Sequence, residues 1–413
     1  MVDIKGKRLL LLGGTRISCE IIRAAQEMEV EVIVADYNTI DNSPGKQMVQ
    51  ESYEISVLDV EKIIELIQTK RIDGVLTGFS DTLLVPYAEI CMKANLPCYG
   101  TVEQFKMFTD KKEYKALCNR FDIPTMEECL IDVIDDTIDF PVIVKPRKGS
   151  GSRGITICNT KEELLSVIGK EDGFEKQVII EKYINAPETT VFWVFVDGQY
   201  YLSAVADRHI KEIQKGVIPL PIGYTFPSDA QEKYLVDVVP KVKKMLEYMD
   251  VRNGMMFMQC KMIDGVCHVY DIGYRLTGSL EYLVFEKMHS FNPLKMMIRY
   301  ALTGNMGDAV TGKKSPLLKN KYGWNISILM KPGIVDTYNG IDSVEKRNDV
   351  IRVVPELLPG DEILESDVGK LKQICLRILG VSNSYEEMRQ SIEEINVLLD
   401  VKNKENESIR YWL

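Results

Sequence analysis

The amino-acid sequence predicts a protein of mixed α/β and α+β class that is built from three parts. In the first part, strands and helices alternate at the spacing of βαβ units, which favours a parallel sheet. The composition changes at residues 109–112, and strands predominate from Phe140 onward. Short strands and turns follow Lys313, and two more helices are predicted after them. Because 413 residues exceed what one compact core holds, we expect domains over residues 1–108, 109–310 and 311–413.

The N-terminal part is predicted to begin with a strand that runs into a glycine turn. Gly13, Gly14 and Thr15 follow this strand, and Asp36 lies at the end of the next one. These residues form part of a dinucleotide-binding pattern, but the full GxGxxG fingerprint is missing. A tight strand-to-helix turn is the favoured interpretation, and NAD binding by a Rossmann dehydrogenase is the weaker one. The predicted strands cover residues 7–12, 30–37 and 73–78, and the helices cover 17–28, 60–69 and 82–94.

The two later parts are predicted to be richer in strands. A charged helix over 109–120 should end before Pro124, because a proline disfavours helix in the residue before it. An antiparallel pair over 255–276 should turn at Asp264 and Gly265. Further helices are predicted over 230–249, 291–304, 368–379 and 384–398, and further strands over 140–145, 154–158, 177–184, 189–198 and 199–210.

Composition excludes several classes of partner and site. The net charge of −10 argues against general affinity for nucleic acid or for an anionic membrane. No apolar run approaches the ~20 residues that span a bilayer. Nine cysteines without a CxxC pair, and no export signal, lead us to expect reduced thiols in a cytoplasmic protein. With only three histidines, histidine-based zinc chemistry is not expected.

The most informative stretch is PVIVKPRKGSGSRG, residues 141–154. An apolar strand ends at Lys145, and a loop rich in glycine, serine and basic residues follows it. Glycines allow backbone N–H groups to approach a phosphate closely, and the basic side chains supply positive charge. The lysine precedes the glycines, so this is not a P-loop, and we predict a hairpin flap over a polyphosphate. A flexible surface hairpin is the alternative; the flap residues are Lys148, Gly149, Ser150, Gly151, Ser152 and Gly154.

Three further motifs follow in order along the chain. Glu181 and Glu188 flank a short polar turn after a strand. Gln259 and Asp271 fall on the two strands of one predicted hairpin. After Asp271 come Arg275 and then the segment Thr277-Gly278-Ser279.

Together, the glycine loop and these motifs resemble the ATP-grasp superfamily, in the branch that contains biotin carboxylase, carbamoyl-phosphate synthetase and the amino-acid ligases. The resemblance covers most of the chain. It implies a parallel-sheet pre-ATP-grasp domain, a two-lobed ATP-grasp core and a smaller C-terminal α+β domain. It also implies ATP and Mg²⁺ (with Mn²⁺ as an alternative) as cofactors, and a homodimer is an expected assembly because many relatives are dimers.

The resemblance assigns nucleotide-binding roles to residues of the central part. Lys111 and Lys145 would contact phosphates, under the closed flap. Glu181 would accept a hydrogen bond from the adenine amino group, and Glu188 would hold the ribose hydroxyls. Solvated surface roles remain open for Lys111, Glu181 and Glu188, whereas Lys145 in an apolar strand would be costly without a partner. The adenine edge would be read by the segment Lys182, Tyr183 and Ile184.

The metal site is where the sequence departs from the family pattern. The family ends a strand with ExNxR, and this chain has Asp271, Gly273 and Arg275 at those positions. Glycine has no side-chain ligand, so we expect one Mg²⁺ at Asp271 with Gln259, and two fully held ions are in doubt. A charge partner for Arg275 or a lysine is the alternative role of Asp271. By resemblance, Arg275 stabilises the transferred phosphoryl group and acts in catalysis with Lys145.

The substrate contacts are predicted from two segments. Arg208 could hold a carboxylate by a bidentate contact, and His209 could orient a substrate or act as a base, with a solvated strand end as the alternative. Backbone N–H groups of Thr277, Gly278 and Ser279 could bind the acyl group. Glu281 and Tyr282 are further candidates for contacts to an amine.

These assignments predict an ATP-dependent carboxylate–amine ligase that acts through an acyl phosphate and releases ADP and phosphate. Its partners would be a small carboxylate, such as an amino acid, and an amine. One alternative is a phosphorylating enzyme of the carbamoyl-phosphate synthetase type, although the chain shows no second ATP-grasp copy and no evident glutaminase half. Another is a nucleotide-binding regulatory protein with impaired catalysis, which Gly273 supports. The dehydrogenase interpretation leaves Glu181, Glu188 and Asp271 unexplained.

Overall fold

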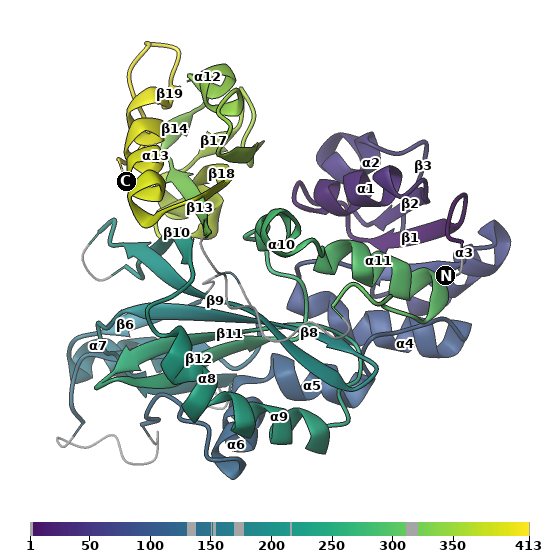
Figure 1. The fold of residues 1–413 in the computed structure, drawn as a ribbon, viewed down its shortest axis with the longest axis horizontal. Coiled ribbons are helices and arrows are strands. Elements are labelled where there is room, and N and C mark those ends of the chain that lie inside the picture. Colours follow the sequence, from purple (N-terminus) through teal and green to yellow (C-terminus); the bar gives the residue numbers. More distant parts are fainter. Residues whose placement is uncertain are drawn as a thin grey trace.

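The N-terminal part forms a parallel sheet of four strands in the order β3-β2-β1-β4. In this computed structural model, residues 3–129, 138–149, 151, 154–168, 177–214, 217–310 and 321–412 are described. Figure 1 shows helices on both sides of the sheet, as βαβ units require. The strands are β1 Arg8–Leu12, β2 Glu31–Asp36, β3 Glu51–Glu54 and β4 Gly74–Thr77, and the helices are α1 Ser18–Glu27, α2 Pro44–Gln47, α3 Val60–Lys70, α4 Leu84–Ala94 and α5 Val102–Thr109.

The central part combines a small and a large antiparallel sheet. The small sheet has the order β6-β5-β7, and the large sheet has the order β12-β11-β8-β9-β10-β13-β18-β16. The predicted hairpin flap corresponds to β5 and β6, which pair antiparallel. The strands of this part are β5 Val142–Pro146, β6 Thr156–Cys158, β7 Val178–Lys182, β8 Glu188–Val196, β9 Gln199–Lys211, β10 Leu220–Phe226, β11 Gly254–Ile263 and β12 Val266–Gly273, and α6 is Lys111–Arg120.

The large sheet continues into the C-terminal part. Strand β10 pairs with β13 (Tyr322–Leu329), so residues from the predicted second and third domains share one sheet. Residues 322–409 nevertheless have an apolar core of their own. Helix α11 (Pro293–Thr303) returns to the N-terminal sheet: a Cβ on Gly74 of β4 would lie 2.1 Å from the carbonyl oxygen of Ala301. The three predicted parts are therefore joined by a shared sheet and by this returning helix.

The fold class is confirmed, and two predicted elements are corrected. Residues 368–379 were expected to be helical, but the second half of them belongs to β18 (Ile374–Ser382), between β13 and β16. A strand with both faces buried has a continuous apolar run, which periodicity cannot separate from a buried helix. The predicted helix 230–249 is broken into α8 (Gln231–Asp237) and α9 (Val239–Tyr248), with a proline in the first turn of α9.

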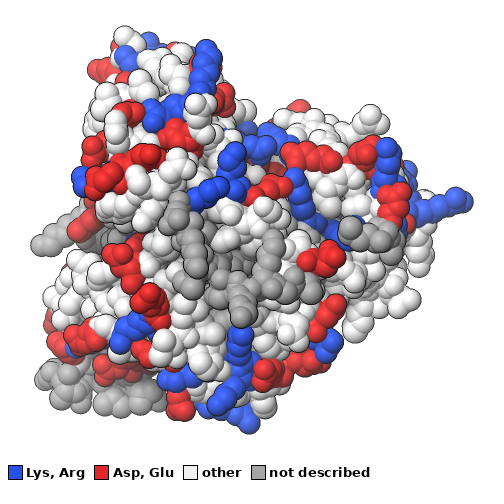
Figure 2. Space-filling model, in the orientation of Figure 1, with Lys and Arg blue, Asp and Glu red and all other residues white. Residues whose placement is uncertain are grey.

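The remaining elements surround these sheets. Among the described residues, no helix has the length and apolar composition needed to cross a bilayer. On the face shown in Figure 2, acidic and basic side chains are interspersed over the N-terminal and C-terminal parts. The other elements are α7 Lys161–Ile168, α10 Glu281–His289, β14 Gly333–Ile334, β15 Thr337–Asn339, α12 Ile341–Glu345, β16 Val350–Pro355, β17 Glu362–Ile363, α13 Tyr385–Leu398 and β19 Asp400–Lys402.

Candidate active site

A cavity of about 220 Å³ is lined by both the small and the large sheet of the central part. Most of the predicted site residues line it, although they come from distant segments of the chain. Lys148 is exposed, and neither it nor Gly154 is part of the lining. Ser150 and Ser152 lie outside the described residues. The predicted residues in the lining are Lys111, Lys145, Gly149, Gly151, Glu181, Lys182, Tyr183, Ile184, Glu188, Arg208, Gln259, Asp271, Arg275, Thr277, Gly278 and Ser279.

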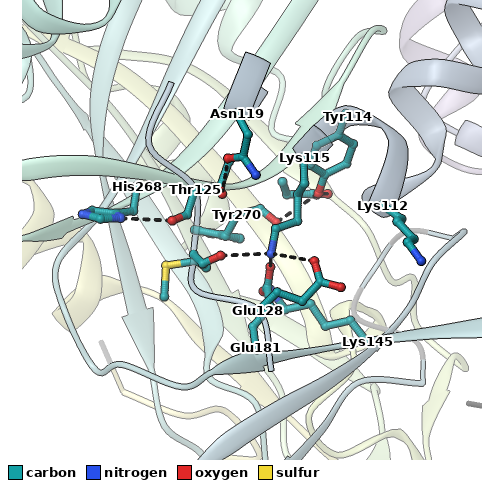
Figure 3. A network of polar contacts seen from close by, with 12 residues as sticks. Lys112, Tyr114, Lys115, Asn119, Thr125, Glu128, Lys145, Glu181, His268 and Tyr270 are labelled. Atoms are coloured by element: carbon teal, nitrogen blue, oxygen red, sulfur yellow. Dashed lines mark hydrogen bonds and ion pairs between the residues drawn. The ribbon is translucent and has the colours of Figure 1, made fainter. Parts of the chain in front are cut away.

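Lys145 is held in the cavity wall by a buried carboxylate. Its Nζ lies 2.5 Å from Oε2 of Glu181, whose side chain is 0% exposed. Lys115 of α6 lies 2.5 Å from the other oxygen of Glu181 and also donates to the Met126 carbonyl (Figure 3). Burial alone would raise the pKa of Glu181, but Lys145 and Lys115 hold it below its ordinary value. Glu181 is therefore an anion that fixes the position of both ammonium groups.

Glu188 on β8 is a second carboxylate whose two oxygens both have partners within the protein. Lys261 Nζ lies 3.0 Å from its Oε1, and the hydroxyl of Tyr270 donates to its Oε2 at 2.8 Å. Arg208 Nη1 donates to the same Oε2. Burial opposes ionisation, yet Arg208 and Lys261 hold the pKa of Glu188 below its ordinary value. Arg208, the predicted anchor for a substrate carboxylate, is thus already engaged by a carboxylate of the protein.

Lys111 differs from the other lysines of the wall. It begins α6, is 7% exposed, and donates from Nζ to the carbonyl of Gly149 in the glycine loop at 3.1 Å. Among the described residues it has no carboxylate within ion-pair distance. Nearby, Arg147 donates to Oδ2 of Asp110 at 2.8 Å, which ties the start of the loop to the N-terminus of α6. The loop therefore meets a buried cation that is available to an anionic ligand.

Asp271 and Gln259 face each other in the register of β11 and β12, as predicted. Burial raises the pKa of Asp271, whereas Lys111 lowers it. A carboxylate and an amide oxygen suit Mg²⁺, which usually takes its remaining ligands from phosphates and water. No group of three or more His, Cys, Asp or Glu side chains that could hold a metal occurs among the described residues. The donor set therefore fits one ion that is bound together with a nucleotide.

The absent asparagine at position 273 has a structural counterpart. A Cβ on Gly273 would lie 2.2 Å from Cε1 of Phe257, so the ring of Phe257 occupies the space of a side chain. The guanidinium of Arg275 lies over this ring at 5.1 Å from its centroid. Asp81 of the N-terminal part accepts from Arg275 Nε at 2.5 Å and from Nη2 at 3.0 Å. Position 273 is therefore part of a packed support for Arg275.

The lining of the cavity also includes Thr277, Gly278, Ser279 and Arg377. Arg377 comes from β18, where its Nε donates to Glu356 at 2.9 Å. His209 is not part of this cavity, which corrects its predicted substrate role. Successive residues of a strand point to opposite faces, so His209 faces away from the side of Arg208. Its Nε2 lies 2.8 Å from Oγ1 of Thr225, and it lines a separate hollow beside α13.

Sequence reasoning missed several residues of the site. Lys261 carried a usable signal, because it follows Gln259 by two residues on the same strand and so shares its face. Lys115 lies one helical turn beyond Lys111, which also places the two on one face of α6. Asp81 and Arg377 come from the N-terminal and C-terminal parts, and no local pattern links them to the cavity. The missed residues are Asp81, Lys115, Lys261, Tyr270 and Arg377.

The N-terminal glycine turn is closed. Gly14 N donates to Asp36 at 2.8 Å, and the Gly14 carbonyl accepts from the Ser43 hydroxyl at 3.1 Å. A Cβ on Gly14 would lie 2.1 Å from Oγ of Ser43, and Gly45 packs against the same backbone. No space is left at Gly14 for a pyrophosphate, so the favoured interpretation, a tight strand-to-helix turn, agrees with the geometry.

The sequence comparisons match a ligase family model, a carboxylase subunit and a synthase chain. Residues 109–253 match the family model described as D-ala D-ala ligase C-terminus. The chain is 24% identical over 331 residues to the 2-oxoglutarate carboxylase small subunit of Hydrogenobacter thermophilus, covering 74% of this chain and 64% of that one. It is 22% identical over 362 residues to the carbamoyl phosphate synthase large chain of Clostridium beijerinckii, covering 84% and 32%. The chain thus spans under two thirds of one relative and about a third of the other.

Solved structures match nearly the whole chain. The L-amino acid ligase from Bacillus licheniformis superposes with a TM-score of 0.78 at 17% identity and covers 97% of this chain and 99% of that one. Phosphoribosylglycinamide synthetase from Anaerococcus prevotii gives 0.76 at 18% identity, covering 97% and 100%. The biotin carboxylase domain dimer of the Hydrogenobacter thermophilus 2-oxoglutarate carboxylase, in complex with MgADP and bicarbonate, gives 0.74 at 20% identity, covering 96% and 90%. At these identities the likeness establishes a shared fold.

Proposed function

This chain is a member of the ATP-grasp superfamily of ATP-dependent ligases and carboxylases, and from that premise we propose that it is a carboxylate–amine ligase. Its carboxylate substrate would be an amino acid or another small acid. The L-amino acid ligase matches over nearly its full length, whereas the match to carbamoyl phosphate synthase covers 32% of that chain. The chemistry would release ADP and phosphate and form an amide bond.

The residues of the cavity suit the first half of this reaction. A carboxylate must be activated before an amine can displace its oxygen, and transfer of the γ-phosphoryl group of ATP gives an acyl phosphate. Lys111 and Lys145 would bind phosphate oxygens, and Arg275, braced by Asp81 and Phe257, would stabilise the charge on the transferred group. A bound Mg²⁺ would supply further positive charge against the phosphates, held by the side chains of Asp271 and Gln259.

One observation carries the proposal. Glu181 and Glu188 neutralise the cations around them, but Lys111 has no carboxylate partner among the described residues and lies against the glycine loop. A buried cation that forms no ion pair is costly, so this one is expected to meet an anion of a ligand. Lys145 lines the same cavity, and an ATP phosphate is the ligand that these two lysines suit best.

The experiment incubates the purified chain with Mg-ATP and with pools of amino acids and small carboxylic acids, and it resolves ADP, AMP and phosphate. ADP and phosphate that depend on a pool would support ligation and begin to identify the substrate. AMP and pyrophosphate would indicate adenylation and contradict the proposal. Size-exclusion chromatography of the same sample would test a homodimer, the assembly of the Hydrogenobacter domain in its crystal.

A second candidate function is a nucleotide-binding regulatory protein, which Gly273 favours because it removes one metal ligand. This candidate predicts that ATP binds tightly and that no pool causes turnover. A phosphorylating enzyme of the carbamoyl-phosphate synthetase type would instead release ADP with bicarbonate as the only added acid. The same assay separates these outcomes.

A further inference from the structure

We propose that Glu281, acting through the hydroxyl groups of Thr277 and Ser279, accepts a proton from the incoming amine. This inference rests on the ligase function proposed above and deepens it. It assigns the proton acceptor of the second half of the reaction, in which the amine displaces phosphate. Glu281 does not line the cavity, so the two hydroxyl groups connect it to the substrate.

Three oxygen atoms form a compact triangle, and two of them belong to the cavity-lining residues Thr277 and Ser279. Ser279 Oγ lies 2.6 Å from Oε2 of Glu281, and Thr277 Oγ1 donates to the same carboxylate oxygen. The two hydroxyl oxygens are 2.7 Å apart. When Glu281 is ionised, only the two hydroxyl groups carry a proton that can form a hydrogen bond within the triangle. The triangle has three short oxygen–oxygen contacts, so one of them has no proton between its two oxygens. The cluster can therefore take up one proton without any movement of its heavy atoms.

Glu281 has fewer charged partners than the buried carboxylates Glu181 and Glu188. Its side chain is buried, and its Oε1 has no hydrogen-bond partner among the described residues. No cation of the described chain lies within ion-pair distance of it, whereas Glu181 and Glu188 each have two. Burial raises the pKa of Glu281, while Ser279 and Thr277 oppose that rise. Glu281 can thus change its protonation state where Glu181 and Glu188 are held as anions.

The elements packed against α10 bring few charges toward Glu281. Arg377 on β18 lowers its pKa, but its guanidinium is engaged by Glu356. Arg352 on β16 is paired with Glu20 at 2.7 Å. On β13, Asn325 donates to the carbonyl of Ser279 and has no titratable group. These neighbours fix the cluster in place, and burial and the two hydroxyl groups have larger effects on the pKa of Glu281 than Arg377 has.

The proton count of the step is balanced. An ammonium must lose two protons to become an amide nitrogen. One passes to a Thr277 or Ser279 hydroxyl, which hands its own proton to Glu281, and the amine is then free to attack. The C–N bond forms, the C–O bond to phosphorus breaks, and phosphate leaves with that electron pair. The second proton leaves on phosphate, so the products are the amide, hydrogen phosphate and protonated Glu281.

The test compares two nucleophiles on one protein. Hydroxylamine is mostly unprotonated near neutral pH, so it needs no base, whereas an aliphatic amine is mostly ammonium. The full chain is given Mg-ATP and an equimolar pool of the amino acids, with or without hydroxylamine. Hydroxamate formation reports activation of the carboxylate, and phosphate release without hydroxylamine reports amine ligation.

For Glu281→Gln, we expect the ratio of amine ligation to hydroxamate formation to fall on the order of 100-fold, the usual contribution of a general base. Raising the pH should recover part of this loss, because the amine then loses its proton to solvent. Ser279→Ala should give a fall in the same ratio while it retains Glu281. Glu286→Gln is the matched control on α10, since Glu286 pairs with Lys295 outside the cavity, and its ratio should equal that of the parent.

Other outcomes overturn the inference at different levels. If Glu281→Gln lowers both rates equally, the residue is structural and the relay is wrong, although the ligase function stands. If it lowers neither rate, Glu281 accepts no proton in this reaction. If the parent chain forms neither hydroxamate nor amide from the pool, the ligase function on amino acids fails and the inference fails with it.

Discussion

Two glycine turns follow strands in this molecule, and they use glycine for opposite purposes. After β1, Gly14 is packed shut: both of its backbone polar groups are bonded, and a Cβ would strike Ser43 at 2.1 Å. After β5, Gly149 has a φ of +117°, and a Cβ there would meet nothing within 4 Å. The first turn needs glycine because the neighbouring backbone is close. The second needs it for its conformation and leaves space beside Lys111.

The difference shows which glycine pattern points to a ligand. Both turns could be interpreted from sequence as phosphate-binding, because each follows a strand and each has a charged residue nearby. In the closed turn the carboxylate of Asp36 occupies the backbone N–H of Gly14 that a phosphate would use. In the open turn Lys111 donates to a backbone carbonyl and lacks a carboxylate partner among the described residues. The two turns therefore differ in whether the nearest charged side chain already occupies the group that a phosphate would contact.

The largest effect is expected for Lys145, which ends the strand before the open turn. Lys145→Ala should lower pool-dependent ADP release by on the order of 100–1,000-fold, because a preorganised cation is removed from the developing charge. Steady-state kinetics of ADP formation measures this effect. Lys244→Ala, on the exposed face of α9, should retain the parent rate.

Folding must be separated from chemistry in this variant, because Lys145→Ala also removes one of the two partners of Glu181. Loss of a partner from a buried ion pair can cost about 3–5 kcal/mol. Lys145→Gln keeps a hydrogen-bond donor beside Glu181, and thermal unfolding reports whether it is folded. A folded Lys145→Gln variant with the parent turnover would contradict the assignment.

An intermediate effect is expected for Gly14→Ala in the closed turn. The new methyl group must displace Ser43, and such overpacking costs about 1–3 kcal/mol of unfolding free energy. Urea denaturation measures the loss. The KM for ATP should stay at its parent value, because Gly14 does not line the cavity. A raised KM with unchanged stability would show that the closed turn does bind the nucleotide.

The smallest effect on stability is expected for Gly149→Ala in the open turn. An L-residue is strained at this φ by about 1–2 kcal/mol, and an exposed loop can relax part of that strain. The unfolding free energy should therefore fall by under about 1 kcal/mol. The KM for ATP should rise several-fold, since the carbonyl of Gly149 would shift away from Lys111. An unchanged KM would remove this loop from the nucleotide site.

The parts of the fold and of the site that depend on local sequence patterns could be predicted from the sequence. The βαβ spacing predicted the N-terminal sheet, and the turn at Asp264 and Gly265 predicted the hairpin that pairs Gln259 with Asp271. The lysine in an apolar strand predicted a buried partner, and Glu181 is that partner. Each of these features depends on residues that are close in sequence or on a motif with a fixed order.

Features that depend on distant contacts could not be predicted in this way. Strand β18 was expected to be a helix, because its apolar run gives no alternation when both faces are covered. Asp81 and Arg377 join the site only because the N-terminal and C-terminal parts close around it. Arg208 was expected to bind a substrate carboxylate, but it forms an ion pair with Glu188. The spacing of these two residues in the sequence does not reveal that pair.

The shared sheet also has a consequence for synthesis of the chain. Strand β10 ends at Phe226, and its partner β13 does not begin until Tyr322. At ~5–20 residues per second, roughly 5–20 s pass on the ribosome between the two. During that interval one edge of β10 has no strand to bond, and exposed strand edges pair readily with other chains. A nascent chain of this protein therefore carries an open sheet edge, and a chaperone that covers β10 would prevent its association with a neighbouring nascent chain.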